Sequence, residues 1–115
     1  MKIKESNITV NVKDLSASVA FYESIGMTLK NRWGDFYAQV TAPGVIIGLH
    51  PTTAEHLPGN SGNTSIGFTV DDLEDAQMVL GQASIRAARR EEEGGQFLHF
   101  NDPDGTSLYF IKPKW

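Results

Sequence analysis

The sequence contains no cysteine, which excludes disulfide bonds, thiolate nucleophiles and the cysteine-based zinc and iron–sulfur sites. It also lacks any apolar run long enough to cross a membrane. The first six residues, MKIKES, carry too many charged and polar groups to form the apolar core of a signal peptide. We therefore expect a cytoplasmic protein without a membrane partner.

Positive charge is also scarce. The formal net charge is −4, and the basic cluster at 86–90 (RAARR) is followed directly by Glu91, Glu92 and Glu93. Binding to nucleic acid requires a clustered basic surface that neutralises phosphates, so no nucleic-acid partner is expected. We expect these opposite charges to cancel one another on a solvated hairpin. A chain of 115 residues suits one domain with one core, which we place at 1–115.

The chain does contain an internal repeat. Segment 7–15 (NITVNVKDL) is echoed by 65–73 (SIGFTVDDL), and segment 43–49 (PGVIIGL) is echoed by 104–110 (DGTSLYF). The first segment of each copy alternates polar and apolar residues, as a strand does, and ends at an aspartate that can cap a helix. Repeats of this length indicate two similar half-domains.

Periodicity and turn residues predict the same order of elements in each half. The first half reads as a strand at 6–12, a helix over 15–25 capped by Asp14 or Ser16, and strands at 27–33, 36–41 and 45–50. The second reads as a strand at 64–70, a helix over 73–83, and strands near 85–90, 96–101 and 106–112. The pattern predicts an α+β fold of two βαβββ modules, with module one at 1–50, a linker at 51–62 and module two at 63–115.

A helix followed by antiparallel strands covers one face of its sheet and leaves the other face bare. Strand parity assigns these residues to the covered faces: Ile8, Val10, Val12, Ile66, Phe68, Val70, Leu108 and Phe110. The opposite parity gives Asn7, Thr9, Asn11, Gly48, His50, Ser65, Gly67, Thr69, Ser107 and Tyr109. This second set is small or polar, and we expect it to line a ligand cavity where the two sheets curl towards each other.

Several motifs resemble the vicinal oxygen chelate superfamily, which includes glyoxalases, bleomycin- and fosfomycin-resistance proteins and extradiol dioxygenases. They are segment 12–18 (VKDLSAS) leading to Phe21-Tyr22, then Gly26, segment 68–72 (FTVDD) and segment 100–105 (FNDPDG). Together with the repeat they cover almost the whole chain. The resemblance implies that the two modules form an incomplete eight-stranded barrel around a cleft, commonly in a homodimer.

Enzymes of this superfamily hold a divalent metal with four histidine, glutamine or glutamate side chains on the concave wall. The resemblance places those four positions at Asn7, Gly48, Ser65 and Tyr109. None of these residues supplies the imidazole or carboxylate that normally holds a catalytic divalent metal. We therefore expect no metal and no other cofactor.

The remaining polar and aromatic residues leave alternatives open. His50 and His99 share the concave parity. They either hydrogen-bond a bound molecule, or are partly exposed strand histidines, or form a relocated metal site with Tyr109. Trp33 and Phe36, beside Arg32, either stack on a planar ligand or pack within their hairpin or against a second copy. Our candidate ligand-binding set is Asn7, Asn11, Trp33, His50, Ser65, His99 and Tyr109. No pair of residues is singled out as a nucleophile and its base, so no catalytic residue is assigned.

Three functions fit these observations. The leading hypothesis is a protein without the usual metal ligands that binds a small organic molecule, such as an antibiotic or a metabolite, and sequesters it for resistance or stress response. The second is a lyase, isomerase or thiol-transferase of the glyoxalase type with relocated metal ligands. The third is a dimeric module whose cleft is filled by side chains and which serves protein contacts.

Overall fold

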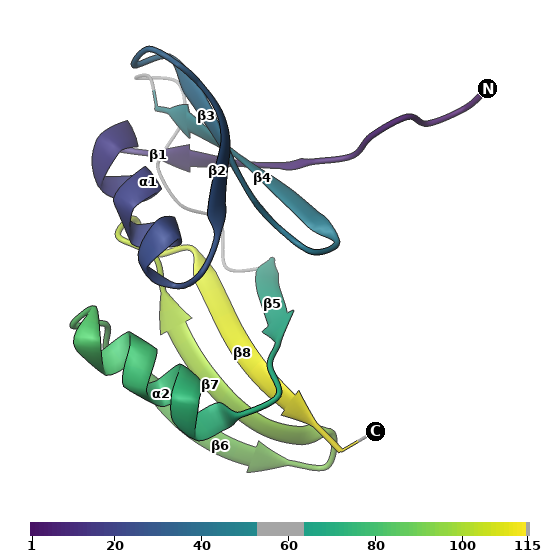
Figure 1. Ribbon diagram of the computed structural model, residues 1–115, viewed down its shortest axis with the longest axis vertical. Helices are drawn as coiled ribbons and strands as arrows, with labels where there is room; N and C mark the ends of the chain where they lie inside the picture. Colours follow the sequence, from purple (N-terminus) through teal and green to yellow (C-terminus); the bar gives the residue numbers. More distant parts are fainter. Residues whose placement is uncertain (53–63, 115) are drawn as a thin grey trace.

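The computed structural model describes residues 1–52 and 64–114, and it contains two four-stranded sheets with one helix each (Figure 1). The first module consists of β1 (Ile8–Val12), α1 (Leu15–Ser24), β2 (Thr28–Trp33), β3 (Tyr37–Ala42) and β4 (Val45–Pro51). The second consists of β5 (Ser65–Thr69), α2 (Leu73–Gln82), β6 (Ala88–Glu92), β7 (Gly95–Asn101) and β8 (Ser107–Pro113). The α+β fold with the order βαβββ in each half is confirmed.

Both sheets have the same strand order. It is β1-β4-β3-β2 in the first sheet and β5-β8-β7-β6 in the second. The first and last strands of each module are parallel, with Ile8 opposite Ile47 and Ser65 opposite Ser107. The other neighbours are antiparallel. Neither sheet closes on itself, which agrees with an incomplete barrel.

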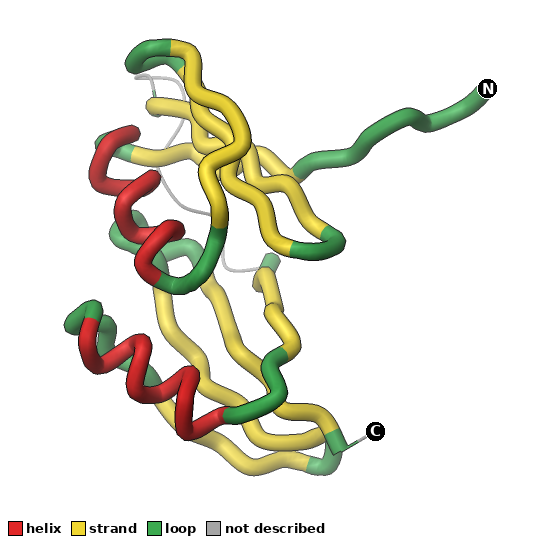
Figure 2. The backbone as a smooth tube through the Cα atoms, in the orientation of Figure 1, coloured by secondary structure: helices red, strands yellow, loops and turns green. Residues whose placement is uncertain are grey.

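Each helix covers one face of its own sheet. Figure 2 shows both helices on the same side of the molecule, so the bare faces of the two sheets lie on the other side. The covered faces carry the core, including Val12, Leu49, Leu98 and Leu108, all at most 1% exposed. Ile8 was expected there but is 41% exposed, because it lies at the start of β1 where the polar N-terminal segment enters the sheet. No helix in the described part of the chain is long and apolar enough to cross a membrane.

Local differences from the sequence-based expectations concern the ends of elements. Asp14, rather than Ser16, caps α1, with its carboxylate accepting a hydrogen bond from the Ala17 amide at 3.0 Å. The sixth strand begins at Ala88 instead of 85, because the Ile85 amide bonds the Leu80 carbonyl at 2.8 Å and closes the end of α2. β4 extends to Pro51. The rest of the proposed linker from residue 53 onwards lies outside the described residues.

The charges expected to cancel on the β6–β7 hairpin are arranged differently. Arg89 lies 2.8 Å from Glu74 and 2.9 Å from the amide oxygen of Gln77, both on α2. Arg89 of β6 therefore pairs with the helix that covers its sheet and not with the glutamates that follow it. Glu91 and Glu92 are exposed on the edge of the sheet.

A buried hydrogen bond joins the two modules. The Tyr22 hydroxyl on α1 donates to Asp102 Oδ2 in the β7–β8 turn at 2.7 Å. The other carboxylate oxygen of Asp102 accepts from the Asp104 amide at 2.9 Å and the Thr106 amide at 2.8 Å. The adjacent Lys13 amide donates to Asp104 Oδ1 at 3.2 Å. The Asp102 carboxylate therefore stabilises the β7–β8 turn and also binds α1 to that turn.

This junction also sets the protonation of its tyrosine. Tyr22 has no exposed surface and Asp102 is 5% exposed. Burial, and then the neighbouring Asp102 carboxylate, raises the pKa of the Tyr22 phenol well above its usual value. The phenol is therefore a permanent hydrogen-bond donor at any physiological pH.

Replacing Tyr22 with Phe leaves a buried carboxylate oxygen of Asp102 without its donor. We expect the free energy of unfolding to fall by about 1–3 kcal/mol in urea denaturation. Above pH ~10 the difference from the natural protein should shrink, because Tyr22 then ionises only in the unfolded chain and weakens the natural protein.

Thr106→Val is a matched control at the same junction. The Thr106 hydroxyl is buried and has no hydrogen-bond partner among the described residues. Its replacement by an isosteric apolar side chain should keep or raise stability. A loss in Thr106→Val as large as that in Tyr22→Phe would show that the junction depends on packing rather than on the Tyr22–Asp102 bond.

Candidate ligand-binding site

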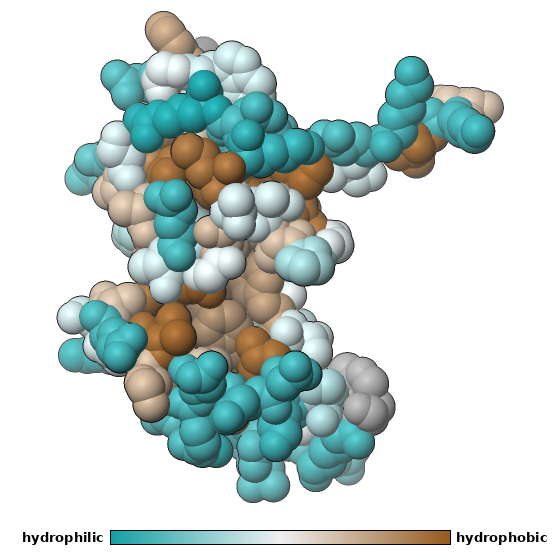
Figure 3. Space-filling view, viewed as in Figure 1, coloured by the Kyte–Doolittle hydropathy of each residue, from teal (hydrophilic) through white to brown (hydrophobic). Residues whose placement is uncertain are grey.

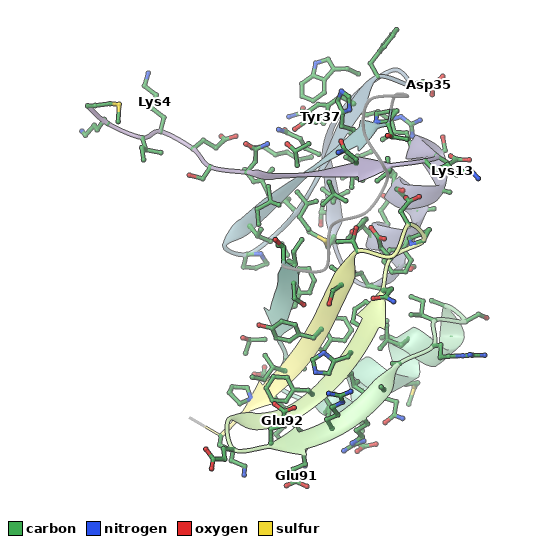
Figure 4. The ribbon with its side chains drawn as sticks, turned by 180° about the vertical axis from the view of Figure 1, so that it is seen from behind. Lys4, Lys13, Asp35, Tyr37, Glu91 and Glu92 are labelled. Atoms are coloured by element: carbon green, nitrogen blue, oxygen red, sulfur yellow. The ribbon has the colours of Figure 1, made fainter. Side chains whose placement is uncertain are left out.

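The bare face of the first sheet carries a pair of stacked aromatic rings. Trp33 at the end of β2 lies opposite Tyr37 at the start of β3. Their ring centroids are 5.5 Å apart and their planes differ by 26°. The Tyr37 hydroxyl accepts from the Asn7 amide at 3.3 Å and from the Gln39 amide at 3.4 Å. Tyr37 is labelled in Figure 4, where it lies high on β3.

Gly48 makes room for the Tyr37 ring. A Cβ atom built on Gly48 would overlap the Tyr37 hydroxyl and lie 2.9 Å from Cζ. Gly48 is one of the four positions where the resemblance places a metal ligand, and at this position a carboxylate would have to displace the tyrosine ring. The metal expected of the superfamily therefore does not fit the residues present at this position.

The bare face of the second sheet carries a cluster of three rings, Phe97, His99 and Tyr109. The Phe97 and His99 rings are stacked, with centroids 5.7 Å apart and planes at 9°. Tyr109 lies 5.7 Å from His99 and 5.9 Å from Phe97. Its ring lies across Gly67 on β5, where a Cβ atom would overlap it. In both modules, then, a tyrosine side chain occupies the space over a glycine of the bare face.

Hydroxyl and amide groups border the rings. The Ser65 and Ser107 hydroxyls are 2.9 Å apart across the β5–β8 pair. Asn11 and His50 are neighbours in the β1–β4 register. Each bare face therefore combines aromatic rings with hydrogen-bonding groups, a combination typical of small-molecule sites.

The seven predicted binding residues fall into two groups. Asn7, Asn11, Trp33 and His50 belong to the first module, and Ser65, His99 and Tyr109 belong to the second. The structure thus assigns His50 and His99 to different sheets. Within the described residues, no three histidine, aspartate or glutamate side chains gather closely enough to hold a metal ion.

Two aromatic residues of the bare faces were missed in the sequence. Phe97 shares the parity of His99, two residues further along the same strand, so its position was available from the pattern. Tyr37 begins β3 after the turn at 34–36, and nothing in the sequence marks it as a binding residue. Its place in the site follows from its pairing with Trp33 across the hairpin. Phe36, by contrast, is 82% exposed at the tip of the hairpin.

A groove of about 700 Å³ runs along the junction between the modules. Phe21, Ile85, Phe100 and Pro103 contribute apolar surface to it, and His99 is the only member of the predicted binding set that lines it. Figure 3 shows apolar side chains at the waist between the modules and hydrophilic ones over the lower module. The bare faces themselves are open surfaces in the single chain, with Trp33 51% exposed.

A family model of the glyoxalase/bleomycin resistance protein/dioxygenase superfamily matches residues 6–110. The chain belongs to this superfamily. No curated protein matches the sequence.

Solved structures of superfamily members have the same fold. TnmS3, an antibiotic binding protein from Streptomyces sp. CB03234, matches with a TM-score of 0.80 and 22% identity over 99% of both chains. A bleomycin-binding protein in complex with bleomycin matches with a TM-score of 0.74 and 20% identity over 97% of this chain and 100% of that one. A lactoylglutathione lyase from Agrobacterium tumefaciens matches with a TM-score of 0.73 and 16% identity over 96% of both chains. At these identities the similarity establishes the fold.

Gly67→Ala tests whether the aromatic cluster depends on its glycine. The added methyl group should push Tyr109 off β5, disturb its contacts with His99 and Phe97, and lower the free energy of unfolding by about 1–3 kcal/mol. Urea denaturation measures the loss, and the near-ultraviolet circular dichroism spectrum reports the ring rearrangement.

Gly81→Ala provides the control. Gly81 lies inside α2, and nothing is within 4 Å of a Cβ atom built on it. This variant should gain about 0.5–1 kcal/mol from helix propensity. Equal stability of Gly67→Ala and the natural protein would contradict the close approach of Tyr109.

Proposed function

We propose that this protein binds and sequesters a small organic molecule with planar aromatic rings, such as an antibiotic or an aromatic metabolite. The observation that carries the proposal is a group of aromatic rings, here called a platform, on each bare sheet face. The first platform is Trp33 and Tyr37, and the second is Phe97, His99 and Tyr109. In each platform the tyrosine lies over a glycine. Stacked rings that are already fixed in place bind another flat ring without first losing side-chain freedom.

The polar groups beside the platforms support specific binding over non-specific adsorption. On the first face the Asn7 and Gln39 amides surround the Tyr37 hydroxyl. On the second, the Ser65 and Ser107 hydroxyls lie beside the ring cluster. Such groups orient a ligand whose rings are held by stacking. Two structural relatives, an antibiotic binding protein and a bleomycin-binding protein, agree with this class of ligand.

We further propose that the functional form is a homodimer. In a single chain both bare faces are open, whereas a small-molecule site normally buries most of the surface of its ligand. A second copy can supply the opposing wall.

Binding is proposed to need no metal. The four positions where the resemblance places metal ligands hold Asn7, Gly48, Ser65 and Tyr109. The Tyr37 and Tyr109 side chains occupy the space over Gly48 and Gly67. A metal-dependent lyase, isomerase or thiol-transferase is the alternative. The two functions differ in one measurable respect, which is the effect of a chelator.

The test is isothermal calorimetry and thermal shift with bleomycin and a panel of planar aromatic antibiotics, in buffer containing EDTA. We expect at least one compound to raise the melting temperature, because a ligand that binds only the folded chain stabilises it. Trp33→Ala and Tyr109→Ala should each weaken that compound's Kd by about tenfold, or ~1.4 kcal/mol.

Phe36→Ala is the matched control for Trp33→Ala. Phe36 belongs to the same hairpin but makes no ring contact in the described part of the chain, so its loss should leave Kd unchanged. Binding that requires added metal would support the enzyme alternative. Absence of binding across the panel would count against sequestration of aromatic molecules.

A further inference from the structure

The groove of about 700 Å³ at the junction between the modules is built by a single chain, and the proposed function does not use it. Its apolar lining includes Phe21 from α1, Ile85 and Ala87 from the segment between α2 and β6, and Phe100 from β7. Phe21, Ile85 and Ala87 are only half-buried. The groove is as large as typical small-molecule sites, and it leaves apolar surface that a ligand can cover.

The polar side chains that line the groove are suited to an anion. Ser84, Arg86 and Asn101 are exposed, can donate hydrogen bonds, and have no side-chain partner among the described residues. Asp102 is the only carboxylate in the lining. It is 5% exposed and already accepts hydrogen bonds from the Tyr22 hydroxyl and from two amides of its own turn. The one exposed formal charge in the groove is therefore the positive charge of Arg86.

Arg86 differs from two other arginines of the chain. Arg32 pairs with Asp35, and Arg89 pairs with Glu74. Arg86 forms no ion pair within the part of the chain that the structure describes, although it lies between Ile85 and Ala87, which both contribute to the apolar lining. A guanidinium group binds a carboxylate through two parallel hydrogen bonds. The groove thus offers an unpaired carboxylate receptor beside an apolar surface.

The backbone at Ser84 gives independent support. Ser84 has a φ of 59° and is the only described residue other than glycine with a positive φ. The Ser84 amide bonds the Gly81 carbonyl at 3.1 Å and the Ile85 amide bonds the Leu80 carbonyl at 2.8 Å, which is a helix ending that favours glycine. The chain carries serine where glycine would be more stable, and strained residues of this kind gather at binding sites. What the serine adds is a hydroxyl in the groove.

We propose that the junction groove binds a free carboxylic acid with a flexible apolar chain. The chain lies against Phe21 and Ile85, and the carboxylate accepts hydrogen bonds from the Arg86 guanidinium and the Ser84 hydroxyl. A flexible chain suits the groove better than a planar ring does. The Phe21 and Phe100 rings are tilted by 44° with centroids 6.5 Å apart, so they offer no common plane for stacking.

This site is separate from the two platforms. Of the groove lining, only His99 and Ser107 also belong to a bare face. The inference therefore does not depend on the binding of a planar aromatic molecule, and either site can be absent while the other binds.

Calorimetry and thermal shift with decanoate, below the concentration at which it forms micelles, test the site. We expect one decanoate to bind per chain and to raise the melting temperature. Decanol lacks the charge and acetate lacks the chain, so each should bind at least about tenfold more weakly than decanoate.

Two arginine variants test the role of Arg86. Arg86→Gln should weaken the Kd for decanoate by at least about tenfold, because a charge-assisted hydrogen bond is lost. Arg90→Gln is the matched control, since Arg90 is equally exposed, loses the same charge and does not line the groove. Its Kd should equal that of the natural protein.

Ser84→Gly separates binding from stability. Glycine relieves the positive φ, so the melting temperature without ligand should rise by about 3–5 °C. The lost hydroxyl should weaken the Kd for decanoate by about threefold. A residue with a purely structural role would not give a more stable protein that binds less well.

Several results would overturn the proposal. Equal Kd values for Arg86→Gln and Arg90→Gln, or decanol that binds as tightly as decanoate, would exclude recognition of the carboxylate. A natural protein that does not bind decanoate would exclude the site. In nuclear magnetic resonance spectra, decanoate should shift the Phe21 ring and leave the Trp33 indole in place, and the reverse pattern would assign the ligand to a bare face. Calorimetry with planar antibiotics still reports separately on the platforms.

Discussion

The hydrogen bond from the Tyr22 hydroxyl to the Asp102 carboxylate is a buried, directional contact between the two modules, and the other features of the molecule depend on how the modules are arranged. Each module is a sheet with one covered face, and apolar residues of both modules form one core cluster, with the Phe21 and Phe100 rings 6.5 Å apart between them. A buried carboxylate that accepts hydrogen bonds from its own turn and from the neighbouring helix provides a directional connection. Because α1 is held against the β7–β8 turn, both helices lie on one side and both bare faces on the other.

The bare faces have a common design. In each, a glycine on one strand leaves room for the ring of a tyrosine on an adjacent strand, and further aromatic rings lie beside that tyrosine. The same arrangement occupies the space over Gly48, one of the positions where the resemblance places a metal ligand. Aromatic stacking and metal binding therefore compete for this part of the face, and here the residues favour stacking.

Most of the fold was predictable, because alternation, helix caps and the repeat are local signals. The register of the strands follows from which residues face the core. The residues predicted for the covered faces lie there, but Ile8 is exposed because it begins β1, next to the polar N-terminal segment. The beginning of β6 was placed three residues early, because the closure of α2 through Ile85 is a tertiary feature. The binding residues were only partly predictable. His99 and Tyr109 follow from parity, whereas the role of Tyr37 depends on a ring contact across a hairpin and on the space over Gly48.

The most direct measurement of aromatic binding is the nuclear magnetic resonance spectrum of the labelled aromatic side chains during titration with a stabilising planar antibiotic in EDTA. Ring currents from a stacked ligand should shift the resonances of Tyr37, His99 and Tyr109, while those of Tyr22, which is buried at the junction, stay in place. Shifts confined to Phe21 and Phe100, in the groove between the modules, would contradict binding on the bare faces. So would shifts that appear only when a divalent metal is added.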